Sequence, residues 1–350
     1  MRMELDEVPV FWSPRLSKRA GGRLFEDTQL ADAPFSFARV LGRALFGGLV
    51  MATALGVGTT VGSALTDSAG LDGFPGRLVP AALVSAIAVP LVAFAARRDR
   101  RRAEWLGYGG ARASARALLT GVAVTATAAA LVLSAGTAAG MMRWSSPDIV
   151  TLGWFLVSNA VVAFLLEAWP EETTLRGYTW ASLRGQLGGA GAAFGTTMVF
   201  LLVPGASTVA GSATAHLIGV KADPIGIAPN GQNPADYAIL LVVFGLTLVA
   251  ARTALRQASL WTSIGTHVTF LTASRILLDG DRRDTGWPVD ATPSASLLVP
   301  AFLLLALAGF TVCRRVGRRG PGPRLDVAQP DRTGFAPLHG REPSEGDGRL

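Results

Sequence analysis

The chain has 350 residues, of which 50% are hydrophobic and only 16% are charged, and its mean hydropathy is +0.38. Soluble domains carry about 25% charged residues, so the composition excludes a pair of ordinary soluble domains. The single cysteine, Cys313, excludes an intrachain disulfide and a cysteine-built zinc or iron–sulfur site. The sequence predicts an all-α polytopic membrane protein. Its net charge of +7 does not indicate nucleic-acid binding, because the basic residues flank apolar segments and contact lipid headgroups there.

The apolar stretches predict about eight transmembrane helices, since a membrane helix needs about 20 mostly apolar residues. In chain order the predicted spans are 44–65, 78–96, 115–140, 149–169, 190–203, 237–251, 259–278 and 294–313. The fifth span is short and rich in glycine, so we expect it to be tilted or to be extended by the polar stretch 183–189. The chain then divides into an N-terminal segment (1–36), a membrane domain (37–315) and a tail (316–350) that its composition predicts to be disordered.

The basic residues predict the orientation of these spans. They follow spans two, four, six and eight, which all end on one side of the membrane, and they recur in segment 1–36. The members of this set are Arg15, Lys18, Arg19, Arg23, Arg97, Arg98, Arg100, Arg101, Arg102, Arg176, Arg184, Arg252, Arg256, Arg314, Arg315, Arg318 and Arg319. The positive-inside rule makes that side cytoplasmic. We therefore expect a multi-pass cell-membrane protein with both termini inside, and no cleavable signal peptide, because segment 1–36 lacks an apolar core.

Ionisable side chains surround the end of the fourth span, where each costs about 2.5–3.5 kcal/mol at bilayer depth and therefore indicates a function. They are Glu167, Glu171, Glu172 and Arg176, and Pro170 lies among them. Because proline removes a helical hydrogen bond, we expect the span to break at Pro170 and a new helix to begin there.

The new helix would carry both adjacent glutamates in its first turn. Glu172 and Arg176 are four residues apart on one face, so we expect them to form a structural ion pair. Glu171 lies about 100° around the helix and would stay outside the pair, available as a general base. The alternative is that these charges only close a helix at the lipid headgroups.

The seventh span carries His267 roughly 12 Å from its cytoplasmic edge. Glu171 lies near the same boundary, so the two side chains can meet in a cavity open to the cytoplasm. A neutral imidazole there can bind a water, a metal or a developing oxyanion. The alternative is a histidine satisfied by a neighbouring Ser or Thr hydroxyl. Arg275, near the far end of the span, is expected to snorkel to the interface.

The residues from Glu171 to Gly177 (Glu-Glu-Thr-Thr-Leu-Arg-Gly) resemble the first motif, E-E-x-x-x-R-G, of the CPBP intramembrane proteases. That family includes the type II CAAX prenyl endopeptidases and the Abi or bacteriocin-immunity proteins. The segment from Ser259 to His267 is similar to the last motif, and the resemblance covers about 149–278. In the family, a glutamate activates a water that attacks a peptide bond. The resemblance implies Glu171 as that base and His267 as the partner of the water or oxyanion.

The same resemblance places Glu172 and Arg176 at the remaining charged positions of the first motif, but two other positions depart from the pattern. The middle motif, F-x-x-x-H, aligns with Phe200-Leu-Leu-Val-Pro204, which puts proline where histidine is expected, and the asparagine position of the last motif is Leu271. Removing one oxyanion donor costs a hydrolase roughly 10²–10³ in rate. The resemblance thus implies an enzyme with impaired catalysis or a silent relative.

His216 is the one other histidine within the membrane domain. We expect it in a long loop, 205–235, on the outer face and away from Glu171, so it does not replace the missing imidazole.

Two classes of function remain open. The first is an intramembrane endopeptidase, a hydrolase that cleaves a peptide or a lipid-modified protein at the cytoplasmic leaflet. The second is a catalytically silent family member that acts as a membrane scaffold, immunity or regulatory protein. A small-solute transporter is disfavoured, because neither an inverted repeat nor a second broken helix is visible. No cofactor is expected, and one histidine with carboxylates offers few nitrogen ligands for tight zinc binding, although a metal is not excluded.

Overall fold

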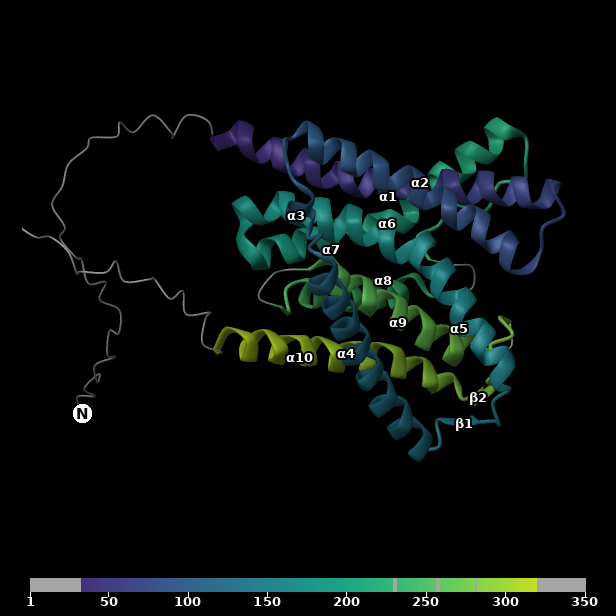
Figure 1. The fold of residues 1–350 in the computed structure, drawn as a ribbon. Coiled ribbons are helices and arrows are strands. Elements are labelled where there is room, and N and C mark those ends of the chain that lie inside the picture. Colours follow the sequence, from purple (N-terminus) through teal and green to yellow (C-terminus); the bar gives the residue numbers. More distant parts are fainter. Residues whose placement is uncertain (1–32, 229–231, 256–258, 281, 320–350) are drawn as a thin grey trace, which may run out of the picture.

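The computed structural model describes residues 33–228, 232–255, 259–280 and 282–319, and these residues form a helical bundle. Most helices run along a common direction, and the start of α1 and the end of α10 lie at the same end of the bundle (Figure 1). The predicted all-α polytopic architecture is confirmed. Most of the N-terminal segment and of the predicted tail lies outside the described residues, and α10 continues to Arg319, past the predicted boundary at 315.

The described elements follow one another in this order: α1 (Ala33–Ser68), α2 (Gly73–Arg98), α3 (Ala103–Leu106), α4 (Ala111–Ala138), β1 (Met142–Trp144), α5 (Ile149–Ala163), η1 (Phe164–Ala168), α6 (Trp169–Glu171), η2 (Glu172–Thr179), α7 (Trp180–Ile218), α8 (Pro234–Arg252), α9 (Leu260–Asp279), β2 (Val289–Ala291), η3 (Pro293–Leu297) and α10 (Leu298–Arg319). The segments η1 and η2 are π-helical and η3 is a 3₁₀-helix. The two strands pair antiparallel, with Arg143 opposite Asp290.

Each of the eight predicted spans coincides with a helix, but the number of membrane crossings stays a prediction. Among the described residues, six helical segments are long and apolar enough to cross a membrane: 37–68, 73–98, 103–138, 149–218, 234–252 and 293–316. The segment 149–218 contains both the fourth and the fifth predicted spans. The helix α9 is not among the six, since it carries polar side chains such as Thr262, His267 and Arg275.

The predicted break at Pro170 was wrong. Residues from α5 through α7 form one continuous helical path, and Pro170 is the middle residue of the short segment α6. Proline has no N–H to donate to the carbonyl of Leu166, and the chain accommodates the lost bond by widening into π-helical turns on both sides. Hydroxyls take up two of the local carbonyls: Thr173 donates to the Trp169 carbonyl at 2.6 Å and Thr174 to that of Pro170 at 2.9 Å.

The sharp change of direction comes later, at Gly188, whose φ of 66° and ψ of −171° are non-helical. Glycine adopts a positive φ without the steric cost of a Cβ atom. Beyond this kink α7 continues past Pro204 to Ile218. His216 therefore lies in the last turn of a helix and not in the predicted loop, whose first half is helical.

The helix α9, which carries His267, packs against α4 through paired glycines. A Cβ atom on Gly121 of α4 would lie 2.1 Å from the Thr262 carbonyl oxygen, and one on Gly265 of α9 would lie 2.4 Å from that of Leu118. Lipid gives little hydrophobic drive for helix association, so small residues that permit close backbone packing stabilise such pairs. This contact sets the position of α9, and with it the position of His267.

The turn before α5 belongs to the end of the bundle that carries the β1–β2 ribbon (Figure 1). Asp148 caps α5 there by accepting from the backbone N–H groups of Val150 and Thr151. The hydroxyl of Thr151 also donates to this carboxylate at 2.8 Å, and these bonds, above all those from Thr151, hold the pKa of Asp148 below its ordinary value.

Candidate active site

The adjacent glutamates lie where the chain passes from α6 into the π-helical segment η2. Glu172 is fully buried and Glu171 is 8% exposed, because both come from a stretch that crosses the interior of the bundle. A π-helical turn brings residue i+5 over residue i, so one side chain can face both carboxylates. The widened turn at Pro170 therefore gathers the charges of this stretch in one place.

Arg176 is the side chain that both glutamates share. Its Nη1 atom donates to Glu171 Oε1 at 3.4 Å and lies 3.4 Å from Glu172 Oε1. The predicted pair of Glu172 with Arg176 is confirmed. The expectation that Glu171 stays outside the pair was wrong, because the π-helical winding brings position i+5 as well as i+4 to the arginine. The guanidinium also lies over the ring of Phe200, 4.4 Å from its centroid, as in a cation–π contact.

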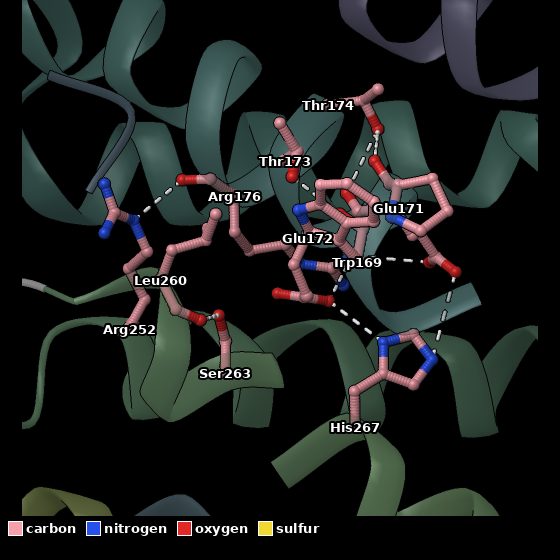
Figure 2. A network of polar contacts seen from close by, with 11 residues as sticks. Trp169, Glu171, Glu172, Thr173, Thr174, Arg176, Arg252, Leu260, Ser263 and His267 are labelled. Atoms are coloured by element: carbon pink, nitrogen blue, oxygen red, sulfur yellow. Dashed lines mark hydrogen bonds and ion pairs between the residues drawn. The ribbon is translucent and has the colours of Figure 1, made fainter. Parts of the chain in front are cut away.

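His267 of α9 faces both carboxylates from the other side (Figure 2). Its Nδ1 atom lies 3.1 Å from Glu172 Oε1, and its Nε2 atom lies 4.0 Å from Glu171 Oε2. The ring is 1% exposed and meets Phe244 edge-on, with the ring centroids 4.8 Å apart. Glu171 and His267 thus meet, as the sequence suggested. The alternative of a histidine held only by a Ser or Thr hydroxyl does not describe this ring, since its partners are carboxylates.

The tautomer of His267 follows from the chemistry of its partner. An ionised carboxylate can only accept a hydrogen bond, so Nδ1 donates to Glu172 when that group is charged. In the neutral ring Nε2 then carries a lone pair that faces Glu171. Two acceptors 4.0 Å apart are too distant for a direct hydrogen bond, but one water molecule can donate to both of them.

A cavity of about 490 Å³ begins at this point. Its walls include Glu171 and His267, while Glu172 and Arg176 lie behind them. Pro204 and Leu271, which stand where the family pattern has histidine and asparagine, line the same cavity. The aligned positions therefore share a cavity with Glu171 and His267, but they contribute an apolar ring and an isobutyl group instead of hydrogen-bonding side chains.

The sequence suggested that Glu171 and His267 could meet in a cavity open to the cytoplasm, and the cavity in which they meet extends toward the end of the bundle that carries the β1–β2 ribbon. The cavity follows α7 toward its C-terminal end, α9 from His267 to Asp279, and the first turns of α8. The residues on the opposite side of the glutamates do not line this cavity. Arg252 is buried there, donates from Nε to the Arg176 carbonyl at 2.8 Å, and lies over the ring of Trp180. The sequence placed Glu171 near the cytoplasmic boundary of its span and gave no indication that Arg252 is buried on that side.

A second ion pair lies along the cavity wall. Arg275 lies 2.5 Å from Glu167 Oε1 and donates to Asn159 Oδ1 at 2.9 Å. The expectation that Arg275 snorkels to the interface was wrong, because an internal carboxylate and amide hold its guanidinium instead. The sequence offered one signal for this contact, namely an asparagine within the apolar run of α5. It did not indicate which residue Asn159 would meet.

Sequence reasoning also missed Tyr237, in the first turn of α8. This side chain lines the same cavity as Glu171 and Glu167. Its hydroxyl has no hydrogen-bond partner among the described residues. No local pattern could have identified it, since its place depends on how α8 packs beside a segment more than sixty residues earlier.

Within the described part of the chain, no group of three or more His, Cys, Asp or Glu side chains is arranged to hold a metal ion. The chemistry that these residues offer is that of a base and hydrogen-bonding groups. In an integral membrane helical bundle, a carboxylate beside an imidazole at the inner end of a cavity is the arrangement expected of an intramembrane hydrolase.

Residues 153–272 match the family model described as type II CAAX prenyl endopeptidase Rce1-like. The match covers about a third of the chain and includes both glutamates, Arg176 and His267. This match confirms the resemblance of residues 153–272 to the CPBP family. No match to the chain was found among the curated proteins or the solved structures. The family implies a CAAX-type intramembrane protease that acts on membrane-associated substrates.

Proposed function

We propose that this protein is an intramembrane endopeptidase that hydrolyses peptide bonds of membrane-associated polypeptides with a water activated by Glu171. The observation that carries this proposal is the separation of 4.0 Å between Glu171 Oε2 and His267 Nε2 at the inner end of the cavity. That spacing lets one water donate to both atoms and present its lone pair to a substrate carbonyl.

In the first step Glu171 takes a proton from this water while the oxygen bonds to the carbonyl carbon, and the carbonyl electrons move onto its oxygen. In the second step the carbon–nitrogen bond breaks, the leaving amine takes the proton from Glu171, and the carbonyl re-forms. A general base contributes roughly 10²–10⁴ in rate. Glu172 and Arg176 act on this reaction through their neighbours: they fix the His267 ring and the orientation of the Glu171 carboxylate.

The developing oxyanion needs a donor, because Pro204 and Leu271 supply none. The Tyr237 hydroxyl supports the proposal here, since it lines the same cavity near Glu171 and can donate a hydrogen bond. We assign it this role in the hydrolysis.

The test uses the full chain in proteoliposomes, with a prenylated peptide and a single-span polypeptide as probes and mass spectrometry of the products. The wild type is expected to cleave at least one probe. Glu171→Gln keeps the shape of the side chain and removes the base, so cleavage should fall at least 10²-fold while the variant stays folded, because Glu172 still pairs with Arg176 and His267. Glu104→Gln removes an exposed carboxylate of α3, outside the cavity, and serves as the matched control. Equal cleavage by Glu171→Gln and the wild type would contradict the proposal.

A second function is favoured by one observation, namely that Pro204 and Leu271 both line the cavity. A silent relative could bind a membrane polypeptide there as a scaffold, immunity or regulatory protein. It predicts that the wild type cleaves neither probe, and that Glu171→Ala and His267→Ala leave the cellular function unchanged.

The sequence favours a substrate at the cytoplasmic leaflet and both termini in the cytoplasm. The positions of the arginines support this orientation of the termini. The direction of the cavity does not support the cytoplasmic leaflet as the source of the substrate.

A further inference from the structure

The two ends of the bundle differ in charge. At one end lie the described basic residues of the start of α1, the end of α2, the start of α4 and of α7, and the ends of α8 and α10: Arg39, Arg43, Arg97, Arg98, Arg100, Arg101, Arg102, Arg112, Arg116, Arg184, Arg252, Arg314 and Arg315. Contacts confirm that these helix ends meet, since Arg43 pairs with Asp99 at 2.7 Å, and Arg184 and Arg314 line one pocket. We call this the arginine-rich end.

At the opposite end aspartates outnumber basic residues. The described aspartates there are Asp67, Asp72, Asp148, Asp223, Asp236, Asp279, Asp284 and Asp290, and the basic residues are Arg77, Arg143, Lys221, Arg282 and Arg283. The positive-inside rule places the arginine-rich end in the cytoplasm. The aspartate-rich end then faces the extracytoplasmic side.

The cavity runs from Glu171 toward the aspartate-rich end. On α9 its lining begins at His267 and continues through Leu271, Ser274 and Leu278 to Asp279, which lies at the C-terminal end of that helix. On α8 it involves only residues up to Phe244, and the segment 226–228 with Gln232 completes the mouth. Gln232 is exposed, so the mouth reaches the surface there.

A second groove continues the cavity along the bundle. It lies between α1 and the C-terminal half of α7, measures about 330 Å³, and shares Leu55, Ser207 and Thr208 with the cavity. Its walls are more polar than those of the cavity and include hydroxyl and charged groups: Thr59, Thr60, Ser63, Asp67, Ser212, Lys221 and Asp223. Such side chains can hydrogen-bond the backbone of an extended polypeptide, whereas the cavity proper is lined largely by apolar side chains that suit an apolar residue.

We infer that the cavity and this groove admit an extended segment of a membrane-anchored polypeptide from the extracytoplasmic side. The segment lies along the groove between α1 and α7, and its cleavage site reaches Glu171 from the outer leaflet. Describing the occupant as a substrate rests on the proposed function. The direction of access does not, because it follows from the cavity and from the distribution of charge.

The test is the sided accessibility of single cysteines, which needs no proteolysis. Cys313 is the only cysteine of the chain, so Cys313→Ala provides a cysteine-free background. Ser274→Cys places a thiol on the cavity wall, Gln232→Cys places one at its mouth, and Ala111→Cys places one at the arginine-rich end as the matched control. Right-side-out and inverted membrane vesicles are labelled with a membrane-impermeant maleimide, and a host marker protein fixes their orientation.

The inference predicts that the cysteines at positions 274 and 232 react at least tenfold faster in right-side-out than in inverted vesicles, and that the cysteine at position 111 shows the reverse. Reaction of positions 274 and 232 from the same side as position 111 would overturn the inference. Failure of both to react from either side, while position 111 reacts, would also overturn it, since the cavity would then be closed. The labelling and the cleavage assay can fail independently. If the cysteines are labelled from the predicted side but neither the wild type nor Glu171→Gln cleaves a probe, the direction of access is supported and the proposed hydrolase is contradicted.

Discussion

The Nε2 atom of His267 lies 4.0 Å from the Oε2 atom of Glu171, although 95 residues separate the two in the chain. Neither side chain is stable alone at membrane depth, and the contact is completed by Glu172 and Arg176 behind it. The same four residues therefore stabilise the bundle and define its candidate site, and the two contributions can be separated by mutation.

Glu172→Gln is expected to destabilise the fold more than Glu171→Gln does. Glu172 is fully buried between Arg176 and His267, and removal of one partner from a buried ion pair costs roughly 3–5 kcal/mol, because it leaves a charge uncompensated. Thermal unfolding of the purified variants in one detergent measures the difference. Similar melting temperatures for the two variants would show that Glu172 does not have the structural role assigned to it.

Tyr237→Phe is expected to slow cleavage by roughly 10²–10³, which is the effect of losing one oxyanion donor. The hydroxyl lines the cavity and bonds to no described residue, so its removal should leave the melting temperature unchanged. Single-turnover cleavage in proteoliposomes measures the rate of the chemical step. A rate equal to that of the wild type would exclude Tyr237 as the donor.

Leu271→Asn combined with Pro204→His restores the two family side chains in a cavity that already contains both positions. We expect cleavage to rise by 10-fold or more, because each donor can be worth roughly 10²–10³. Pro204→His also gives the interior of α7 back a backbone donor, so the variant should fold. The combined variant with Glu171→Gln is the control, and it should be inactive. A wild type without activity and a combined variant with activity would favour the silent-relative alternative.

Gly265→Ala is expected to move α9 away from α4 and to lower both cleavage and thermal stability. The added Cβ atom would lie 2.4 Å from the Leu118 carbonyl oxygen, which belongs to the backbone and cannot turn aside. His267 lies two residues further along this helix, so its distance from Glu171 should change. Gly185→Ala is the matched control, since its Cβ atom would meet nothing within 4 Å. If both substitutions had the same small effect, the close approach of α4 and α9 would not be what positions His267.

The sequence was sufficient to predict the helices and the polar side chains that the bundle brings together around Glu171. Long apolar runs predicted a helix at each of the eight ranges, and isolated charges within them pointed to Glu171, Glu172, Arg176 and His267. Both signals depend on the cost of placing polar groups in lipid. Apolar runs and isolated charges are features of short stretches of sequence, so they can be recognised without any knowledge of packing.

What the sequence could not predict depends on geometry between distant segments. The sequence predicted a helix break at Pro170, whereas the helix continues through π-helical turns on both sides of it. That winding also brings Arg176 to Glu171, against expectation. Arg275 pairs with Glu167 and Asn159 because α9 lies beside α5 and η1. The direction of the cavity likewise depends on how segments distant in the chain pack around the glutamates, as α8 does when it places Arg252 against the Arg176 carbonyl.

The most direct test of the central claim is a double-mutant cycle between Glu171→Gln and His267→Asn, measured as kcat/KM for cleavage in proteoliposomes. Asparagine can still donate to Glu172 in place of Nδ1, while the Nε2 lone pair is lost. If both residues hold one water, the double variant should be no slower than the slower single variant, because groups that act as a unit are strongly non-additive. Rate losses that multiply, or a His267→Asn variant as active as the wild type, would contradict a water shared by the two side chains.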